Sequence, residues 1–288
     1  MAEGEPGRVC LTRLAVLGSP IAHSQSPALH RAAYEVLGID WQYEAIEMES
    51  AGLATFIGAR GPDWRGLSLT MPLKRDVMPL LAVVDPLAEL TGGANTVLFQ
   101  EGAEGPTLHG FNTDVFGIVE AFRDAGVDRL NSVRMLGAGA TAASALVAVA
   151  QLGARRVVVS ARSANKLVAL FDLGEQLGID VQAARADGVD EGIVPEAVIS
   201  TLPGGVDHSY RFDSSTRASS VLFDVAYDPW PSPLATDWLE AGGRVIPGIE
   251  MLVNQALMQV RIFVGGRADK TLPREEVVHA AMRRSVGL

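Results

Sequence analysis

Short apolar runs alternate with amphipathic segments along most of the chain, and this alternation predicts the fold class. The runs at residues 11–17 and 155–160 have the length of buried strands, and the segment at 164–177 has helical periodicity. Strands that alternate with helices are typical of a doubly wound parallel sheet. Residues 95–99 and 107–111 are apolar runs joined by a polar turn, which predicts a hairpin. The pattern therefore predicts an α/β protein with a parallel sheet in its second half.

The remaining apolar runs and amphipathic segments predict the other elements. We expect further strands at residues 41–48, 66–70, 133–136, 181–184, 197–201, 221–225 and 244–246. We expect further helices at residues 27–37, 51–59, 74–84, 85–90, 114–126, 143–152, 233–241, 248–264 and 273–284. Ser26, Ser50 and Thr113 are the expected N-caps of three of these helices, because a hydroxyl oxygen can accept from a free N–H group at a helix start.

A glycine turn follows the strand expected at residues 133–136. The turn is Gly137-Ala138-Gly139-Ala140-Thr141-Ala142, and its order matches the G-x-G-x-x-[G/A] pattern of dinucleotide-binding sites. Gly137 permits the tight turn, Gly139 lets backbone N–H groups approach a pyrophosphate, and Ala142 lets helix and strand pack closely. The helix N-terminus favours the phosphates. The stretch therefore predicts a nucleotide site, although Ala/Gly-rich helix starts also occur without one.

The end of the next strand bears on which dinucleotide is bound. NAD-binding versions carry an Asp or Glu there that binds the ribose 2′-hydroxyl. This chain has Ser160-Ala161-Arg162-Ser163 instead, with no acid in the stretch. An arginine and hydroxyl groups bind a 2′-phosphate, which a carboxylate would repel. We therefore expect NADP, with NAD less favoured. The alternative is that Arg162 is a solvated loop arginine.

Composition limits the other classes of function. The chain has 288 residues, enough for about two domains, and its net charge of −10 argues against a nucleic-acid partner. The single cysteine, Cys10, excludes an intrachain disulfide framework, and the scattered histidines show no metal-ligand spacing. Residues 1–8 lack the features of a signal peptide, so we expect a cytoplasmic protein. Residues 135–154 are uncharged, but the glycine turn within them favours a buried helix over a membrane span.

Three loops of the first half carry clustered polar residues at expected strand ends. Ser24 and Ser26 lie two residues apart at a helix start, which suits a small carboxylate; simple capping by Ser26 is the alternative. Lys74 is also at a helix start, where a cation opposes the helix dipole, and this unfavourable position hints at function. Asp114 begins another helix, where the dipole favours an acid in any case. As a pair, Lys74 and Asp114 could transfer a proton, with Asn95 at the same rim.

Several short motifs lie along the chain in a defined order. They are Ser19-Pro20-Ile21-Ala22-His23-Ser24-Gln25-Ser26-Pro27, Thr70-Met71-Pro72-Leu73-Lys74, Ala94-Asn95-Thr96, Gly110-Phe111-Asn112-Thr113-Asp114, Asp224-Val225-Ala226-Tyr227-Asp228-Pro229, Pro233-Leu234 and Gly248-Ile249-Glu250-Met251-Leu252-Val253-Asn254-Gln255-Ala256. Each is short. Together, in this order and spacing, they resemble the shikimate dehydrogenase family over nearly the whole chain.

The resemblance implies an activity and a role for each matching residue. The activity is the NADP-dependent interconversion of 3-dehydroshikimate and shikimate, a step of aromatic amino-acid biosynthesis. Lys74 would be the acid–base lysine and Asp114 its paired aspartate, while Gly248 would contact the nicotinamide through its backbone. The substrate would be bound by Ser24, Ser26, Thr70, Asn95, Tyr227 and Gln255. The rest of NADP would be bound by Gly137, Ala138, Gly139, Ala140, Thr141, Ala142, Arg162 and Ser163.

The alternation of elements divides the chain into an α/β half at residues 1–112 and a nucleotide-binding half at residues 113–247. Residues 248–288 could belong to either half by pattern alone. The resemblance implies that these closing helices return to the first half, and that the first half is the substrate-binding catalytic domain. The second half would be a Rossmann domain. A small-molecule substrate is the expected partner, without nucleic acid or membrane, for a monomer or a homodimer.

Several positions depart from the family pattern, among them Arg31, which stands where an asparagine is common after His30. Ser68 stands where an asparagine that contacts substrate is common, and Ala140 replaces a glycine of the turn. Ala161 replaces the asparagine of an Asn-Arg-Thr signature for NADP, which makes the preference for NADP less firm.

Two alternatives stay open. One is a paralogue that acts on quinate or aminoshikimate with NAD or NADP, and the other is a non-catalytic NADP-binding sensor. The Ser24 and Ser26 pair favours shikimate by resemblance, and the intact Lys74 and Asp114 argue against a sensor.

Overall fold

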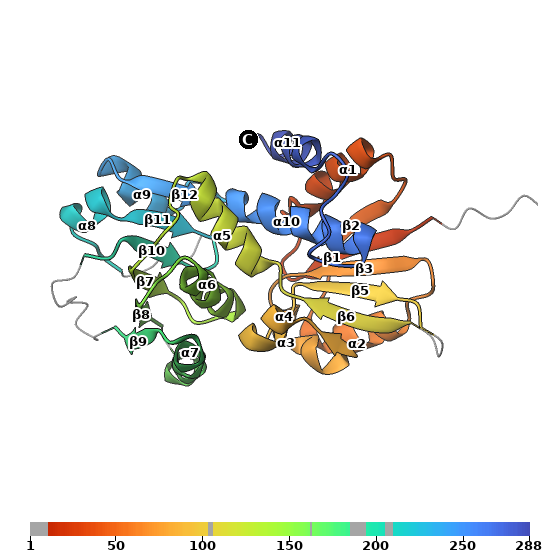
Figure 1. Cartoon of the computed structure of the whole chain (residues 1–288), viewed down its shortest axis with the longest axis horizontal. Helices are drawn as coiled ribbons and strands as arrows, with labels where there is room; N and C mark the ends of the chain where they lie inside the picture. Colours follow the sequence, from red (N-terminus) through yellow and green to blue (C-terminus); the bar gives the residue numbers. More distant parts are fainter. Residues whose placement is uncertain (1–10, 103–105, 162, 185–193, 205–209) are drawn as a thin grey trace, which may run out of the picture.

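The computed structural model describes residues 11–288 apart from 103–105, 162, 185–193 and 205–209. Cys10 and Arg162, singled out in the sequence, lie outside the described residues. The chain forms two six-stranded sheets with helices packed against them, one sheet in each half of the molecule (Figure 1). This arrangement confirms the predicted α/β fold class.

The first sheet is built from the first half of the chain, in the order β2-β1-β3-β5-β6-β4. β1 lies parallel to both of its neighbours, and β5 runs antiparallel to β3 and β6, so the predicted hairpin is confirmed. The strands are β1 (Arg13–Gly18), β2 (Gln42–Glu47), β3 (Trp64–Leu69), β4 (Val83–Val84), β5 (Thr96–Gln100) and β6 (Thr107–Phe111). The helices are α1 (Ser26–Leu37), α2 (Ser50–Gly58), α3 (Leu73–Asp76), the 3₁₀ turn η1 (Met78–Leu80) and α4 (Pro86–Thr91).

The second sheet is wholly parallel, in the order β12-β11-β10-β7-β8-β9. The strand order reverses between β7 and β10, and ligands of such sheets bind at this point, beyond the carboxyl ends of the strands. The strands are β7 (Ser132–Leu136), β8 (Arg156–Ser160), β9 (Asp180–Ala183), β10 (Ala197–Ser200), β11 (Val221–Asp224) and β12 (Arg244–Pro247). The helices are α5 (Asp114–Asp124), α6 (Ala140–Gln151), α7 (Ala164–Leu177), α8 (Ser214–Ser219) and α9 (Pro233–Glu240).

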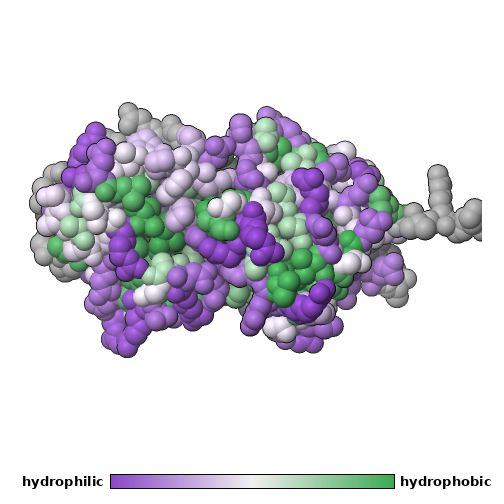
Figure 2. All heavy atoms as spheres, turned by 90° about the horizontal axis from the view of Figure 1, so that it is seen from above, coloured by the Kyte–Doolittle hydropathy of each residue, from purple (hydrophilic) through white to green (hydrophobic). Residues whose placement is uncertain are grey.

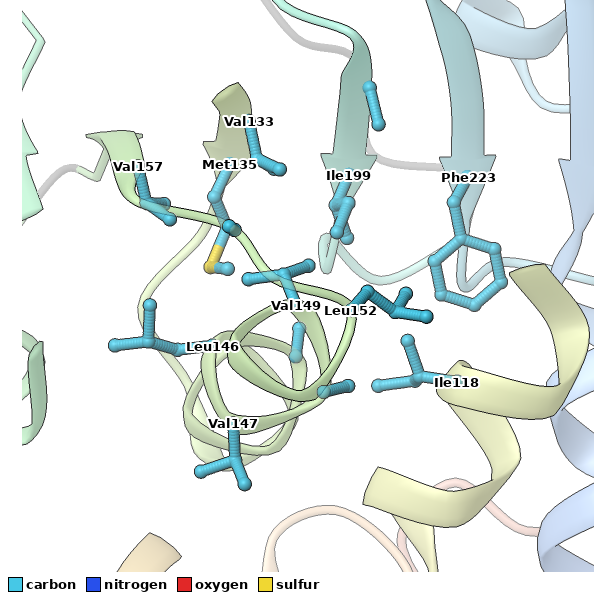
Figure 3. Packing of buried hydrophobic residues seen from close by; sticks show 14 of the residues in the cluster. Ile118, Val133, Met135, Leu146, Val147, Val149, Leu152, Val157, Ile199 and Phe223 are labelled. Atoms are coloured by element: carbon cyan, nitrogen blue, oxygen red, sulfur yellow. The ribbon is translucent and has the colours of Figure 1, made fainter. Parts of the chain in front are cut away.

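α6 is buried against the second sheet, which explains why residues 135–154 carry no charge. Figure 3 shows Val149 of this helix and Leu152 at its C-cap directed toward the sheet residues Met135 and Ile199. Ile118 of α5 closes the same core beside Phe223. The uncharged stretch is therefore a strand, a turn and a helix. No helix among the described residues is long and apolar enough to span a membrane.

The last two helices connect the halves. α10 (Gly248–Gly265) packs against both α5 and α1, and α11 (Glu275–Ser285) packs against α1 (Figure 1). The contact with α5 is close because α5 has a glycine there: a Cβ on Gly117 would lie 2.8 Å from Gln255 Cβ and from the Met251 carbonyl oxygen. Without this close approach, Gln255 could not reach the site described below.

The surface is mostly hydrophilic. On the face shown in Figure 2, hydrophilic residues cover most of both halves, and hydrophobic residues form separate patches between them. The net charge of −10 is consistent with this distribution of polar side chains.

Some local predictions are wrong. The helix expected at residues 74–84 ends at Asp76 and is followed by η1 and β4. Pro79 has no N–H to donate and would clash with a helical backbone, and β-branched Val83 and Val84 pair with β6 instead. α8 was not expected from its polar sequence.

The expected N-caps also differ. Gln25 and Glu49 hold the N-cap positions of α1 and α2, so Ser26 and Ser50 are the first helical residues. At α5, Thr113 holds the N-cap position as expected, but its side chain does not cap the helix; Asn112 Oδ1 accepts from the N–H groups of Asp114 and Val115, at 3.0 and 3.4 Å. The Asn112 side chain thus accepts from the first N–H groups of α5, as a capping hydroxyl would.

Candidate active site

A cavity of about 430 Å³ is lined by residues of both halves of the chain. The loops after β1 and β3 form one wall, and the segments after β7, β10 and β11 form the other. The cavity is thus at the carboxyl ends of strands from both sheets, where ligands of α/β proteins bind. Predicted site residues that line it are Ser24, Ser26, Thr70, Lys74, Asn95, Asp114, Thr141, Tyr227, Gly248 and Gln255.

Lys74 and Asp114 meet in this cavity although they are forty positions apart in sequence. Lys74 Nζ donates to Asp114 Oδ2 at 2.6 Å. The Lys74 side chain is 14% exposed and that of Asp114 is 3% exposed. An ion pair so little exposed is poorly screened by solvent, while the remaining exposure of Lys74 is toward the cavity it lines. The arrangement can hold and move a proton at the cavity wall.

Asp114 is fixed by more than its lysine. Asn95 Nδ2 donates to Asp114 Oδ1 at 2.7 Å, so each carboxylate oxygen has a partner. Asn95 Oδ1 accepts from the Thr113 N–H at 2.8 Å, and Gln255 Oε1 lies 3.2 Å from Asn95 Nδ2. The first turn of α5 adds the positive end of a helix dipole next to the carboxylate. The carboxylate is therefore held in a single orientation.

The wall formed by the loop after β1 carries hydroxyl groups. Ser24 Oγ lies 3.4 Å from the Ser26 N–H, so the two serines are adjacent at the start of α1. Thr70 follows β3 and lines the same cavity. A wall of this kind can bind oxygen-rich groups of a small molecule.

The opposite wall contributes Tyr227 and its neighbour Asp228. Burial raises the pKa of the Tyr227 hydroxyl, and the negative charge of Asp228 acts in the same direction, so this phenol stays neutral and can donate a hydrogen bond. Asp228 Oδ2 lies 3.3 Å from His23 Nδ1, across the mouth of the cavity. Both of these side chains are substantially exposed, so the contact itself adds little stability.

The glycine turn has the geometry that a dinucleotide needs. Gly137 has φ +105°, and a Cβ there would lie 2.4 Å from Thr201 Oγ1. Gly139 is the N-cap of α6 without a side-chain cap, and a Cβ there would meet nothing within 4 Å. The space beside Gly139 is therefore open next to a helix start that has no side-chain cap, and a pyrophosphate suits such a place. Ala140 has a helical backbone, so it costs the turn nothing in place of a glycine.

Other predicted cofactor residues are placed as follows. Ala142 of α6 is fully buried against the sheet, and Ala138 is nearly fully buried. Ser163 is the N-cap of α7, next to Arg162, which lies outside the described residues. A Cβ on Gly248 would lie 2.1 Å from the Val225 carbonyl oxygen, so only glycine fits there, at the cavity wall. Gly137, Ala138, Gly139, Ala140, Ala142 and Ser163 do not line the cavity itself.

Sequence reasoning missed some of the lining residues. Gln259 lines the cavity and is 2% exposed, and it follows Gln255 by one helical turn on α10. The i, i+4 spacing of two glutamines was the available signal, since such residues share one face of a helix. Residues 201–204 were also missed; they follow β10 at the reversal of strand order, which is itself a signal for ligand binding.

The described residues form no metal site. No group of three or more His, Cys, Asp and Glu side chains among them is arranged to hold an ion.

Comparison with known families and curated proteins gives two kinds of match. The model of the shikimate dehydrogenase substrate binding domain matches residues 16–97. The pentafunctional AROM polypeptide of Malassezia globosa is 34% identical over 283 residues, which is 93% of this chain and 17% of that polypeptide. The chain therefore spans about one sixth of the length of such curated relatives.

Two solved structures match over nearly their whole length. Mycobacterium tuberculosis shikimate dehydrogenase is 40% identical, with a TM-score of 0.78, and the match covers 95% of this chain and 99% of that one. Shikimate 5-dehydrogenase from Thermus thermophilus, solved in complex with NADP(H) and shikimate, is 29% identical with a TM-score of 0.77. That match covers 96% of this chain and 100% of that one.

Proposed function

We propose that this chain, which belongs to the shikimate dehydrogenase family, catalyses the NADP-dependent interconversion of 3-dehydroshikimate and shikimate. The observation that carries the proposal is the Lys74–Asp114 pair, 2.6 Å apart at the wall of a cavity lined with hydroxyl and amide groups. A dinucleotide-binding sensor without catalysis would have no use for a nearly buried proton donor at this place. The pair therefore favours an enzyme.

The chain contributes the proton and the orientation of the substrate. In the direction of reduction, Lys74 Nζ gives a proton to the oxygen that forms at the reacting carbon; in oxidation, it accepts that proton. Asp114 holds the ammonium in place and stabilises its positive charge, while Asn95 keeps the carboxylate from turning away. Ser24 and Ser26 would bind the substrate carboxylate, and Thr70, Asn95, Tyr227 and Gln255 its hydroxyl groups.

The N–H groups of the glycine turn and of the first turn of α6 would hold the cofactor pyrophosphate, and the backbone of Gly248 would contact the nicotinamide. The bound cofactor supplies or accepts the hydride. NADP is the proposed cofactor because the strand end Ser160-Ala161-Arg162-Ser163 has cationic and hydroxyl side chains and no acid. The complex of the Thermus thermophilus relative with NADP(H) and shikimate supports both ligands.

The domain assignment belongs to the same proposal. Residues 1–112, completed by residues 248–288, would bind the substrate, and residues 113–247 would bind NADP. The packing of α11 on α1 supports this division. A cytoplasmic location is also proposed, since a single cysteine is typical of a reducing compartment.

Initial rates with four substrate and cofactor pairs test the proposal. Shikimate and quinate are each offered with NADP and with NAD, and kcat/KM is compared. We expect the highest kcat/KM for shikimate with NADP. A higher value for quinate would overturn the proposed substrate, and a higher value with NAD would overturn the proposed cofactor. NADP binding without any turnover would favour an aminoshikimate paralogue or the sensor.

A further inference from the structure

A group of buried polar side chains lies at one end of the cavity, and the proposed mechanism gives most of them no role. Gln259 is at the centre of the group and touches side chains from three other elements. We name this group the Gln259 network; its members are Tyr34, His30, Tyr43, Ser68, Thr96 and Gln259.

The backbone of Asn95 fixes which way the Gln259 amide points. Gln259 Nε2 lies 3.3 Å from the Asn95 carbonyl oxygen, which can only accept, so the amide nitrogen must be on this side. The same nitrogen donates to Thr96 Oγ1 at 3.1 Å, and Thr96 in turn donates to Asn95 Oδ1 at 3.0 Å. Gln259 Oε1 therefore faces His30 and Ser68.

Because Gln259 Oε1 is an acceptor, it determines which ring nitrogen of His30 carries the proton. His30 Nε2 lies 3.1 Å from Gln259 Oε1, so Nε2 carries the hydrogen, and Nδ1 accepts from the Tyr34 hydroxyl at 3.1 Å. Burial lowers the pKa of His30 to about 3, against the opposite effect of the Gln259 hydrogen bond. The imidazole is therefore neutral, as this pattern of donors and acceptors requires.

Gln259 Oε1 also accepts a hydrogen bond from Ser68, which uses the only hydroxyl proton of that residue. Ser68 Oγ donates to Gln259 Oε1 at 2.8 Å and accepts from the Tyr43 hydroxyl at 2.7 Å. Ser68 also lines the cavity. A hydroxyl oxygen has one proton and two lone pairs, so what Ser68 has left for a ligand is a lone pair.

We propose that Gln259 is a specificity-determining positioning residue that keeps Ser68 as a hydrogen-bond acceptor for one hydroxyl group of the substrate ring. This inference rests on the proposed function, in which the ligand is a ring with several hydroxyl groups. A hydroxyl can donate to Ser68, whereas a carbonyl, an ether or a fluorine at the same carbon would bring a second acceptor against its lone pair. Sites built to hydrogen-bond a hydroxyl discriminate strongly against analogues that lack it.

Kinetics with fluorinated substrates test whether Ser68 is an acceptor. Shikimate has two hydroxyl groups that do not react, and fluorine replaces one of them in each of two analogues. We compare kcat/KM for shikimate with that for each analogue, in the unaltered enzyme and in Ser68→Ala. For one analogue, the shikimate-to-analogue ratio should be at least about fivefold larger in the unaltered enzyme than in Ser68→Ala. Equal ratios in both enzymes, for both analogues, would overturn the inference.

Two further variants test the part played by Gln259. Gln259→Met has a similar size but no acceptor, so the Ser68 proton is free to point into the cavity, and the ratio should fall as it does in Ser68→Ala. Tyr34→Phe, the matched control, removes a hydroxyl from the far end of the network and should keep the ratio of the unaltered enzyme. An unchanged ratio in Gln259→Met would show that Gln259 does not orient Ser68; Gln259→Leu serves the same test if the first variant does not fold.

The same data separate this inference from the proposed function. Failure of the unaltered enzyme to turn over shikimate would contradict the proposed function. Turnover of shikimate with equal ratios would contradict only the role of Ser68 and Gln259.

Discussion

His30 is a fully buried histidine whose effect on stability can be measured. Burial lowers its pKa to about 3, whereas an unfolded chain has a histidine pKa of about 6.5. Below about pH 6.5 the unfolded state therefore binds a proton that the native state does not, so the free energy of unfolding falls as the pH falls toward 3. Between about pH 6.5 and pH 5, His30 should account for a loss of about 1.6 kcal/mol.

Urea unfolding at these two pH values, for the unaltered protein and His30→Gln, checks this prediction. The variant should lose less stability on acidification. The exposed His23→Gln is the control and should behave like the unaltered protein. Some loss of stability on acidification should remain in His30→Gln. His279 contributes to it, because burial and the nearby Arg283 lower the pKa of His279. Identical pH dependence in His30→Gln and the unaltered protein would contradict the assignment.

Individual site residues differ in how far the sequence predicts them. Lys74 was noticeable because a cation at a helix start is unfavourable, and Asp114 was its only proposed partner. Their meeting is a tertiary fact, since it needs the segment after β3 and the start of α5 to line one cavity. Ser68 and Gln259 could not be interpreted from sequence, because their roles depend on the Asn95 carbonyl and the orientation of one amide.

The glycine turn between β7 and α6 offers a matched pair of substitutions. Gly137→Ala should destabilise the protein by about 1–3 kcal/mol, because its φ is positive and a Cβ would meet Thr201. Gly139→Ala should leave stability nearly unchanged, because its φ is −85° and a Cβ would meet nothing. It should nevertheless raise the KM for NADP, since the added methyl group enters the space of the pyrophosphate.

Thermal unfolding and cofactor kinetics on both variants provide the measurement. A Gly139→Ala protein with the original KM for NADP would contradict the placement of the pyrophosphate at this turn.

Asn112 links the helix that carries Asp114 to the helix that starts at the glycine turn. Its Oδ1 caps α5, and its Nδ2 donates to Ser144 Oγ on α6 at 3.0 Å. Asn112→Ala should lower kcat, because it removes the cap next to Asp114. Ser144→Ala should mainly raise the KM for NADP, because it cuts only the link to α6.

Steady-state kinetics with shikimate and NADP separate the two effects. Thr91→Val removes another hydrogen-bond partner of Asn112, and as a control it should change neither parameter by much. Equal losses of kcat in Asn112→Ala and Thr91→Val would indicate a general loss of packing in place of a positioning role.

Periodicity predicts long elements well and short ones poorly. α7 has the bounds that its pattern indicates, because its fourteen residues have clear helical periodicity. Residues 74–84 have an apolar pattern that also suits a helix, but Pro79 and the pairing of Val83 and Val84 with β6 divide them. Pairing with a distant strand is a tertiary effect, and a local pattern does not contain it.

The two halves of the molecule meet at the cavity, and we propose that they close over bound ligands. Residues from both halves line the cavity, and His23 and Asp228 approach to 3.3 Å across its mouth. Two domains with few crossings commonly move in this way. Small-angle scattering should show a smaller radius of gyration with NADP and shikimate together than without them. Identical scattering profiles would contradict a closure of the whole molecule.

At this scale the sequence predicts two sheets but not the place of the closing helices. The apolar pattern of residues 248–264 indicates a buried helix without saying which half it covers. Its contacts with both α5 and α1 are fixed by tertiary packing, in particular by the close approach at Gly117.

The central claim is that Lys74 transfers the proton, and one comparison tests it most directly. Arg75 is adjacent in sequence and exposed, so Arg75→Ala is the control for Lys74→Ala. With shikimate and NADP, Lys74→Ala should lose about a hundredfold or more in kcat, with a much smaller change in KM, while Arg75→Ala should keep both. A Lys74→Ala enzyme with the kcat of the Arg75→Ala control would contradict the account.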